Sequence, residues 1–133
     1  MTTNAVVTGI GERSWGPIFA DLDGVAVTDD DNAAISVIIM IETAQALANV
    51  EEIAAVPGVS ALYVGPNDLA LSMGYGRATY RTEPVLEGAI SRVLATANQA
   101  GIVGGVHCSD PQMVHYWRAR ADVPDNLKKP LFV

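Results

Sequence analysis

Apolar residues in this chain form short runs that alternate with segments of helical spacing. Residues 35–41 are a nearly continuous apolar run, β-branched except for Ser36 and Met40. A run of this length and composition is typical of a strand that is buried on both faces of a parallel sheet. Two further apolar runs, residues 61–64 and 102–106, are predicted to be strands of the same kind.

The segments between these runs predict helices with recognisable ends. Apolar residues recur at helical spacing after the first strand, at Leu47, Val50, Ile53 and Ala54. Thr43 suits the N-cap of this helix, and Asn49 with an acid three residues later resembles a capping box at which the helix restarts. The clearest helix has Pro84 in its first turn and Gly101 at its end, and another begins at Asp110.

Alternating strands and helices predict an α/β fold with a parallel sheet. Residues 65–68 (Gly-Pro-Asn-Asp) are predicted to form a tight loop after the second strand. The segment that follows, through Tyr80, contains Gly74 and Gly76 and is expected to be irregular.

Composition narrows the classes of function. The chain has 133 residues, half of them hydrophobic, which is enough for one domain with a core. A net charge of -7, with eight scattered Lys and Arg, argues against a nucleic-acid-binding surface. The single cysteine, Cys108, rules out an internal disulfide and fits a reducing compartment. With neither a secretory signal nor an apolar run of ~20 residues, we expect a cytoplasmic protein without a membrane segment.

Two carboxylates fall where parallel strands end. Glu42 directly follows the first strand, and Asp68 lies shortly after the second. Because the working residues of parallel α/β folds gather at the carboxyl ends of strands, both acids are candidate ligands of a hard divalent cation. His107 also falls at a strand end, but its neighbour Cys108 should point to the opposite face, which disfavours Cys–His catalysis. His115 is predicted to lie on a helix surface.

Two motifs at this spacing resemble the HpcH/HpaI aldolase/citrate lyase family. They are residues 40–53 (Met-Ile-Glu-Thr-x-x-Ala-Leu-x-Asn-Val-x-x-Ile) and residues 64–70 (Val-Gly-Pro-Asn-Asp-Leu-Ala). The resemblance covers about residues 30–118, and residues 13–17, which include Arg13, also resemble a loop of many members. The family fold is a TIM barrel of roughly 250 residues. The resemblance thus implies one partial domain over residues 1–133: a half TIM barrel with a divergent tail at 119–133.

The resemblance also implies a chemistry. The family contains metal-dependent (class II) pyruvate aldolases such as 4-hydroxy-2-oxoheptanedioate aldolase, which cleave 2-oxo-4-hydroxy acids to pyruvate and an aldehyde. By position, Glu42 and Asp68 would bind magnesium or manganese, with cobalt as a further candidate. The loop of Gly65, Asn67 and Asp68 would hold the substrate carboxylate. Pro66 has no N–H, so the amides of Asn67 and Asp68 are the expected donors.

The sequence departs from the family in ways that leave alternatives open. The family's catalytic His and its enolate-stabilising Arg belong to strands that precede the matching region, so the catalytic residues here are unknown. Met40 stands where many members have Gln. Besides an aldolase completed by a partner chain or a replacement base, the chain fits a non-catalytic or relic half-barrel. Such a half-barrel would bind metal and a 2-oxo acid, or a complementing half-barrel, or form a homo-oligomer. A citryl-thioester lyase is the weaker alternative.

Overall fold

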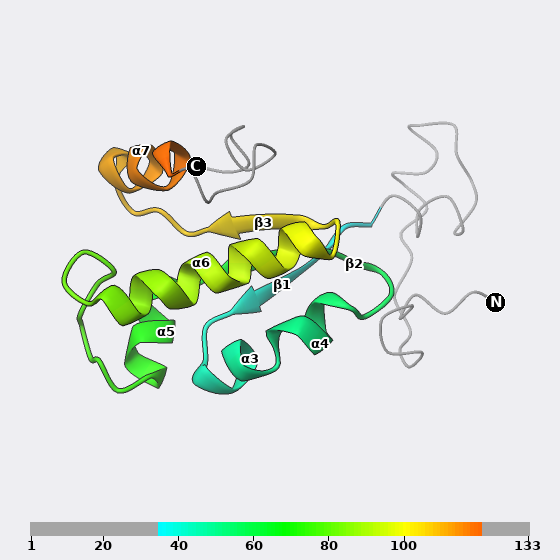
Figure 1. Cartoon of the computed structure of the whole chain (residues 1–133), viewed down its shortest axis with the longest axis horizontal. Helices are drawn as coiled ribbons and strands as arrows, with labels where there is room; N and C mark the ends of the chain where they lie inside the picture. The colour runs from blue at the N-terminus through cyan, green and yellow to red at the C-terminus, as the bar shows by residue number, and fades with distance from the viewer. Residues whose placement is uncertain (1–34, 121–133) are drawn as a thin grey trace, which may run out of the picture.

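The computed structural model describes residues 35–120, which form a three-stranded parallel sheet in the order β1-β2-β3 (Figure 1). The strands are β1 (Val37–Ile41), β2 (Val59–Val64) and β3 (Val103–Val106). All three predicted strands are confirmed, with their ends moved by one or two residues. None of the helices in this described part has the length and apolarity that a membrane crossing requires.

Within residues 35–120, five helices connect and cover the strands: α3 (Ala44–Ala48), α4 (Val50–Ala54), α5 (Pro66–Ser72), α6 (Pro84–Gln99) and α7 (Pro111–Ala119). The Thr43 side chain caps α3 by accepting from the Ala46 N–H, as predicted. The helix restarts at Val50, but the capping box at Asn49 is wrong, because the Asn49 side chain makes no capping bond. Gly101, with φ of 71°, follows α6 in the left-handed conformation that glycine tolerates.

Helix α5 occupies the expected tight loop and the start of the expected irregular segment, which corrects both there, whereas residues 73–80 are irregular, as predicted. Pro66 begins this helix, because its fixed φ suits the first helical position and its missing N–H would have no partner there. Leu69 and Ala70 are buried and anchor the helix to the core. Gly74, with φ of 85°, ends it, and the next amide, that of Tyr75, donates to the Ala70 carbonyl at 2.9 Å.

The core lies on one face of the sheet, beneath α4 and α6. Its largest fully buried side chains are Ile41, Val50, Leu62, Val64, Leu69, Ile90 and Val93. In Figure 1, the long helix α6 runs across the sheet, with α4 beside it.

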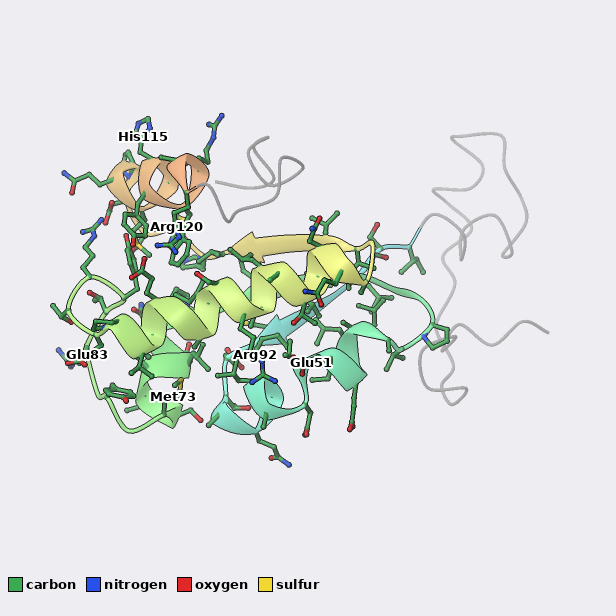
Figure 2. The ribbon with its side chains drawn as sticks, in the orientation of Figure 1. Glu51, Met73, Glu83, Arg92, His115 and Arg120 are labelled. Carbon is green, nitrogen blue, oxygen red and sulfur yellow. The ribbon has the colours of Figure 1, made fainter. Side chains whose placement is uncertain are left out.

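Arg92 of α6 donates two hydrogen bonds to Glu51 of α4, at 3.1 and 2.8 Å, and Figure 2 shows the pair between the two helices. An aromatic cluster of Tyr80, Tyr116 and Trp117 joins α7 to the segment before α6.

The other face of the sheet is less covered, which corrects the prediction of a strand buried on both faces. Burial alternates along β1, and Ile38 and Met40 are 50% and 49% exposed. The helices of residues 35–120 pack on one face only, whereas in a closed barrel other strands would enclose the inner face. Strand β1 is therefore apolar on both faces but buried on one.

Candidate metal and substrate site

The carboxyl edge of the sheet brings three residues into one row. The register pairs Ile41 with Val64 at the ends of β1 and β2. Beyond this pair, the Gly65 N–H donates to the Ile41 carbonyl at 3.2 Å, and the His107 N–H donates to the Val64 carbonyl at 2.9 Å. The ladder therefore extends by one residue on each strand, and Glu42, Gly65 and His107 lie side by side at this edge.

The Glu42 side chain leans over Gly65. A Cβ atom placed on Gly65 would lie 3.3 Å from the Glu42 Cβ and 3.4 Å from its Oε2, and 3.6 Å from the Met40 sulfur. Glycine at this position leaves the space that the carboxylate occupies. Glu42 is partly buried, and the structure confirms that it follows directly on the last residue of β1.

The first turn of α5 presents Asp68 and two backbone donors. The Leu69 N–H makes the first helical hydrogen bond of α5, to the Gly65 carbonyl four residues earlier, at 2.9 Å. The preceding amides, those of Asn67 and Asp68, belong to the N-terminal groups that a helix leaves without an internal partner, and Pro66 has no N–H. An exposed carboxylate and two amides thus share this turn.

A further hydrogen bond connects the segment after Glu42 to α5. The Ala44 N–H, at the start of α3, donates to the Ser72 Oγ at the end of α5, at 2.9 Å. Since neighbouring strands lie about 4.8 Å apart, Glu42 and the first turn of α5 are adjacent along this edge. Within residues 35–120, neither Glu42 nor Asp68 forms an ion pair.

The donor set fits a hard cation that takes its other ligands from elsewhere. No group of three or more His, Cys, Asp and Glu side chains in residues 35–120 is arranged to hold a metal ion. Two carboxylates are nevertheless what Mg²⁺ commonly uses in proteins, because it retains several waters and takes further oxygens from its substrate.

His107 and Tyr63 form a pair that the sequence did not suggest. The Tyr63 hydroxyl lies 3.1 Å from the His107 Nδ1. Cys108, the next residue, packs against the core on the helix side, so the prediction that the two neighbours face apart is confirmed. Burial raises the pKa of the Cys108 thiol, which disfavours the reactive thiolate. His115 is exposed on α7, as predicted.

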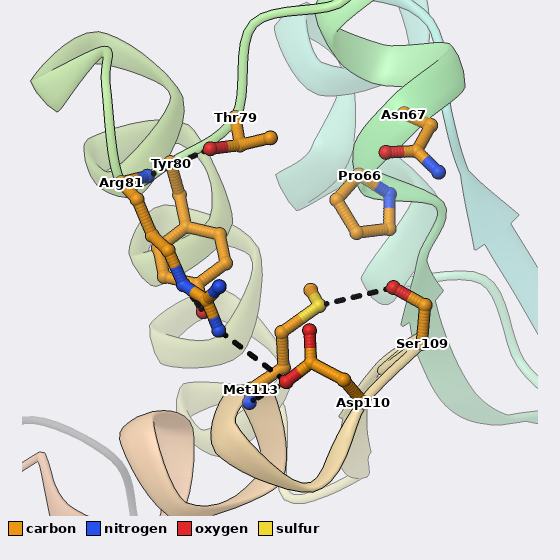
Figure 3. Close-up of a pocket in the computed structure, with 8 residues that line it drawn as sticks. All are labelled: Pro66, Asn67, Thr79, Tyr80, Arg81, Ser109, Asp110 and Met113. Carbon is orange, nitrogen blue, oxygen red and sulfur yellow. Dashed lines mark hydrogen bonds and ion pairs between the residues drawn. The ribbon is translucent and has the colours of Figure 1, made fainter.

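A small cleft opens beside α5 (Figure 3). It is lined by Pro66, Asn67, Thr79, Tyr80, Arg81, Ser109, Asp110 and Met113. Arg81 and Asp110 form an ion pair at 3.4 Å there. The pKa of the Asp110 carboxyl lies below its ordinary value, chiefly because it accepts the Met113 N–H at the start of α7, and also because of Arg81. At about 110 Å³ the cleft is smaller than the ~300–1,000 Å³ of typical ligand pockets.

Two sequence predictions lie outside the described residues. Arg13, with the loop at residues 13–17, precedes residue 35, and most of the divergent tail at 119–133 follows residue 120.

Comparison with known proteins finds relatives of this chain and solved structures that share its fold. A hydroxypyruvate/pyruvate aldolase of Paraburkholderia phytofirmans is 42% identical over 79 residues, which are 59% of this chain and 30% of that protein. A crystal structure of an HpcH/HpaI aldolase/citrate lyase family protein from Burkholderia cenocepacia superposes with a TM-score of 0.66 and 35% identity, covering 81% of this chain and 42% of that one. The expected α/β fold, part of a TIM-barrel-like whole, is confirmed by this likeness.

A more distant structure shares the fold. The citrate lyase β subunit of M. tuberculosis, complexed with oxaloacetate and magnesium, has a TM-score of 0.52 and 23% identity, covering 67% of this chain and 42% of that one. The matched part of the chain covers 30–39% of the length of the first curated relatives. The family model for HpcH/HpaI aldolase/citrate lyase matches residues 4–125. The chain belongs to the HpcH/HpaI aldolase/citrate lyase family.

Proposed function

We propose that this chain supplies the metal-binding and pyruvate-binding half of an aldolase that cleaves 2-oxo-4-hydroxy acids to pyruvate and an aldehyde. The observation that carries the proposal is the row at the carboxyl edge of the sheet, where Glu42 leans over Gly65 and Asp68 follows in the next helical turn. A relative that this chain resembles is named a hydroxypyruvate/pyruvate aldolase, which supports the reaction class.

In this proposal, Glu42 and Asp68 hold a divalent cation, magnesium or manganese. Both side chains are open to a ligand, because neither is engaged in an ion pair within residues 35–120. Oxygen ligands suit these cations, and the remaining positions fall to water and substrate oxygens. When bound, such a cation supplies a Lewis acid that stabilises the negative charge left on pyruvate by carbon–carbon cleavage.

The loop residues Gly65, Asn67 and Asp68 bind the substrate carboxylate in this proposal. The amides of Asn67 and Asp68 are donors without a helical partner, and an anion at the first turn of a helix also gains from the helix dipole. Gly65 has no side chain, so the substrate can lie close to the backbone between Glu42 and the third strand. A small 2-oxo acid presents its carboxylate and keto oxygens in the arrangement that this edge would bind.

The half-exposed inner face favours a second role for the same chain, the binding of a complementing half-barrel. Ile38 and Met40, on the face that α4 and α6 leave uncovered, are about half exposed. Because these relatives of the chain are about twice its length, strands beyond residues 35–120 would cover this face in a closed barrel. Complementing strands, whether from a longer chain, a partner or a second copy, would also supply groups that the described residues lack.

Calorimetric titration of the full chain tests the proposal. We expect Mn²⁺ to bind, and pyruvate to bind only when Mn²⁺ is present. The variants Glu42→Gln and Asp68→Asn should weaken Mn²⁺ binding at least tenfold, because each removes one charged ligand. Glu52→Gln removes an exposed acid of α4 and serves as the matched control with the same charge change. Mn²⁺ affinities that are equal in all three variants would exclude this metal site.

Turnover is a separate measurement. Release of pyruvate from a 2-oxo-4-hydroxy acid is followed by coupling to lactate dehydrogenase and NADH. Binding with turnover supports a complete aldolase, and binding without turnover supports the half-barrel that awaits its complement. Absence of both binding and turnover would leave neither role standing.

A further inference from the structure

The Met40 side chain lies against the position at which we place the substrate. A Cβ atom on Gly65 would be 3.6 Å from the Met40 sulfur, which is van der Waals contact, and 3.4 Å from the Glu42 Oε2. Because side chains alternate along a strand, Met40 and Glu42, two residues apart, project to the same face of the sheet. The space over Gly65 is therefore bounded by a thioether as well as by the proposed metal ligand.

The neighbours of Met40 on this face are apolar. Strand pairing sets Met40 beside Tyr63, and Ile38 precedes Met40 by two residues on the same face. A Cβ atom on Gly105 would lie only 3.0 Å from the Tyr63 Cδ2, so the tyrosine ring lies over the third strand, where the glycine leaves room for it. Ile38, Met40 and the Tyr63 ring thus form an apolar patch next to the substrate position.

The polar atoms of this apolar patch offer little to a ligand. The Tyr63 hydroxyl lies 3.1 Å from the His107 Nδ1, on the side of the third strand. Burial raises the pKa of the Tyr63 phenol, and the nearby Cys108 raises it further, so the patch carries no charge near neutral pH. A thioether donates no hydrogen bond and accepts only weak ones. A hydroxyl group placed against Met40 would therefore lack a strong hydrogen-bond partner in the patch.

The function proposed above determines which part of the substrate faces Met40. In that proposal, the amides of Asn67 and Asp68 bind the carboxylate of a 2-oxo acid, and its keto oxygen goes to the cation beside Glu42. Apart from these oxygens, such an acid has only the carbon group that begins at C3. With the oxygens bound at the carboxyl edge, the C3 group is the part that remains to contact Met40 beside Gly65.

We propose that Met40 selects small 2-oxo acids by the polarity of their C3 group. The inference rests on the function proposed above and deepens it. The methyl group of pyruvate and the ethyl group of 2-oxobutyrate pack on the thioether, which adapts its shape readily. The hydroxymethyl group of hydroxypyruvate would give up hydrogen bonds to water there without replacing them. Met40 is thus a specificity residue and takes no part in breaking bonds.

Calorimetric titration of the full chain with these three acids, at saturating Mn²⁺, tests the proposal. We expect hydroxypyruvate to bind about tenfold more weakly than pyruvate. This is less than the ~100-fold rejection of a hydroxyl by a closed apolar pocket, because Met40 is half exposed. 2-Oxobutyrate should bind about twofold more tightly than pyruvate, since its added CH₂ would be only partly buried.

Two variants of Met40 separate polarity from size. Met40→Gln keeps the length of the side chain and supplies an amide that can pair with a hydroxyl. The ratio of the hydroxypyruvate to the pyruvate dissociation constant should therefore fall about tenfold in this variant. Met40→Leu stays apolar and similar in volume, so it should keep the wild-type ratio within about threefold.

Ile38→Gln is the matched control. Ile38 is as exposed as Met40 and lies on the same face, but it is two residues further from the carboxyl edge, or ~6.6 Å along the strand. This variant should leave the ratio of dissociation constants unchanged. An equal fall of the ratio in Ile38→Gln and Met40→Gln would show that the general polarity of the inner face acts, and would refute the assignment to Met40.

The remaining outcomes separate this inference from the proposed function. If the wild-type chain binds pyruvate with Mn²⁺ but binds hydroxypyruvate at least as tightly, selection by Met40 is wrong, and the metal and pyruvate site stands. The same holds if the ratio of dissociation constants is equal in the wild type and Met40→Gln. If the wild type binds neither Mn²⁺ nor pyruvate, the proposed function fails, and selection by Met40 fails with it.

Discussion

Replacing Gly65 with alanine separates the geometry of the Glu42 carboxylate from the stability of the fold. Gly65 has φ of -95° and ψ of 91°, an extended conformation that alanine adopts without strain. The only new feature is the methyl group, which would lie 3.3 Å from the Glu42 Cβ and 3.4 Å from Oε2. The Glu42 side chain must move by a few tenths of an ångström, and with it the oxygen that we propose as a metal ligand.

Two opposing terms set the effect on stability. Overpacking costs about 1–3 kcal/mol in a tight core, and the partly buried Glu42 side chain places this change near 1 kcal/mol. Alanine also lowers the entropy of the unfolded chain, which stabilises by about 0.4–1 kcal/mol. The free energy of unfolding should therefore change by less than about 1 kcal/mol. A displaced carboxylate should still weaken Mn²⁺ binding about tenfold, or ~1.4 kcal/mol.

Gly88→Ala is the matched control. Gly88 lies exposed within α6, and a Cβ there would meet nothing within 4 Å. Alanine in a helix interior stabilises by about 0.5–1 kcal/mol, so this variant should unfold at higher urea concentration and bind Mn²⁺ as the wild type does. Calorimetry gives the affinities and urea titration gives the stabilities. Equal Mn²⁺ affinity in Gly65→Ala and Gly88→Ala would refute the placement of the metal beside Gly65.

Two further predictions concern the fold. Leu62 is fully buried in the central strand, so Leu62→Ala should lower the free energy of unfolding by about 3–4 kcal/mol. Urea titration measures this loss, and a value below about 1 kcal/mol would contradict the place of Leu62 in the core. The hydrogen bonds from Arg92 lower the pKa of Glu51 in the folded protein. This pair therefore stabilises the fold fully above the unfolded-state pKa of about 4.5, and the stabilisation is lost as the pH falls through the lower folded-state pKa. The difference in stability between wild type and Glu51→Gln should therefore shrink below about pH 4.5, and a difference that grows on acidification would contradict the assignment.

Strand positions and the long helix were predictable because local signals mark them. The strands combine β-branched residues with turn residues at their ends, and α6 lies between Pro84 and Gly101. Parallel strands end at one edge, so the adjacency of Glu42 and the Asp68 loop also followed from the sequence. These predictions needed only the order of elements and the direction of the strands.

The remaining features depend on contacts between distant segments. The alternating burial of β1 depends on which segments cover the inner face of the sheet. The sequence of the strand itself does not indicate this, because its residues are apolar on both faces. Helix α5 is short, and only Leu69 and Ala70 are buried in it, which gave too weak a pattern to distinguish it from a loop. The Tyr63–His107 pair was missed because it needs the strand register. One signal was available, since Tyr63 stands two residues before Gly65 and Gly105 stands two residues before His107.

The strand register places different chemical groups side by side at the end of this short sheet. It also bears on why cation binding and substrate cleavage should be measured separately. One row provides a carboxylate, an open backbone position and an imidazole, because each strand ends one residue before it. Charge stabilisation at such a row is strong only where water is excluded. Ile38 and Met40, beside the row on the inner face, are half exposed, so the described residues leave the site open to solvent. Cation affinity should thus be a property of this sheet edge, whereas the rate of cleavage should rise when the inner face is enclosed.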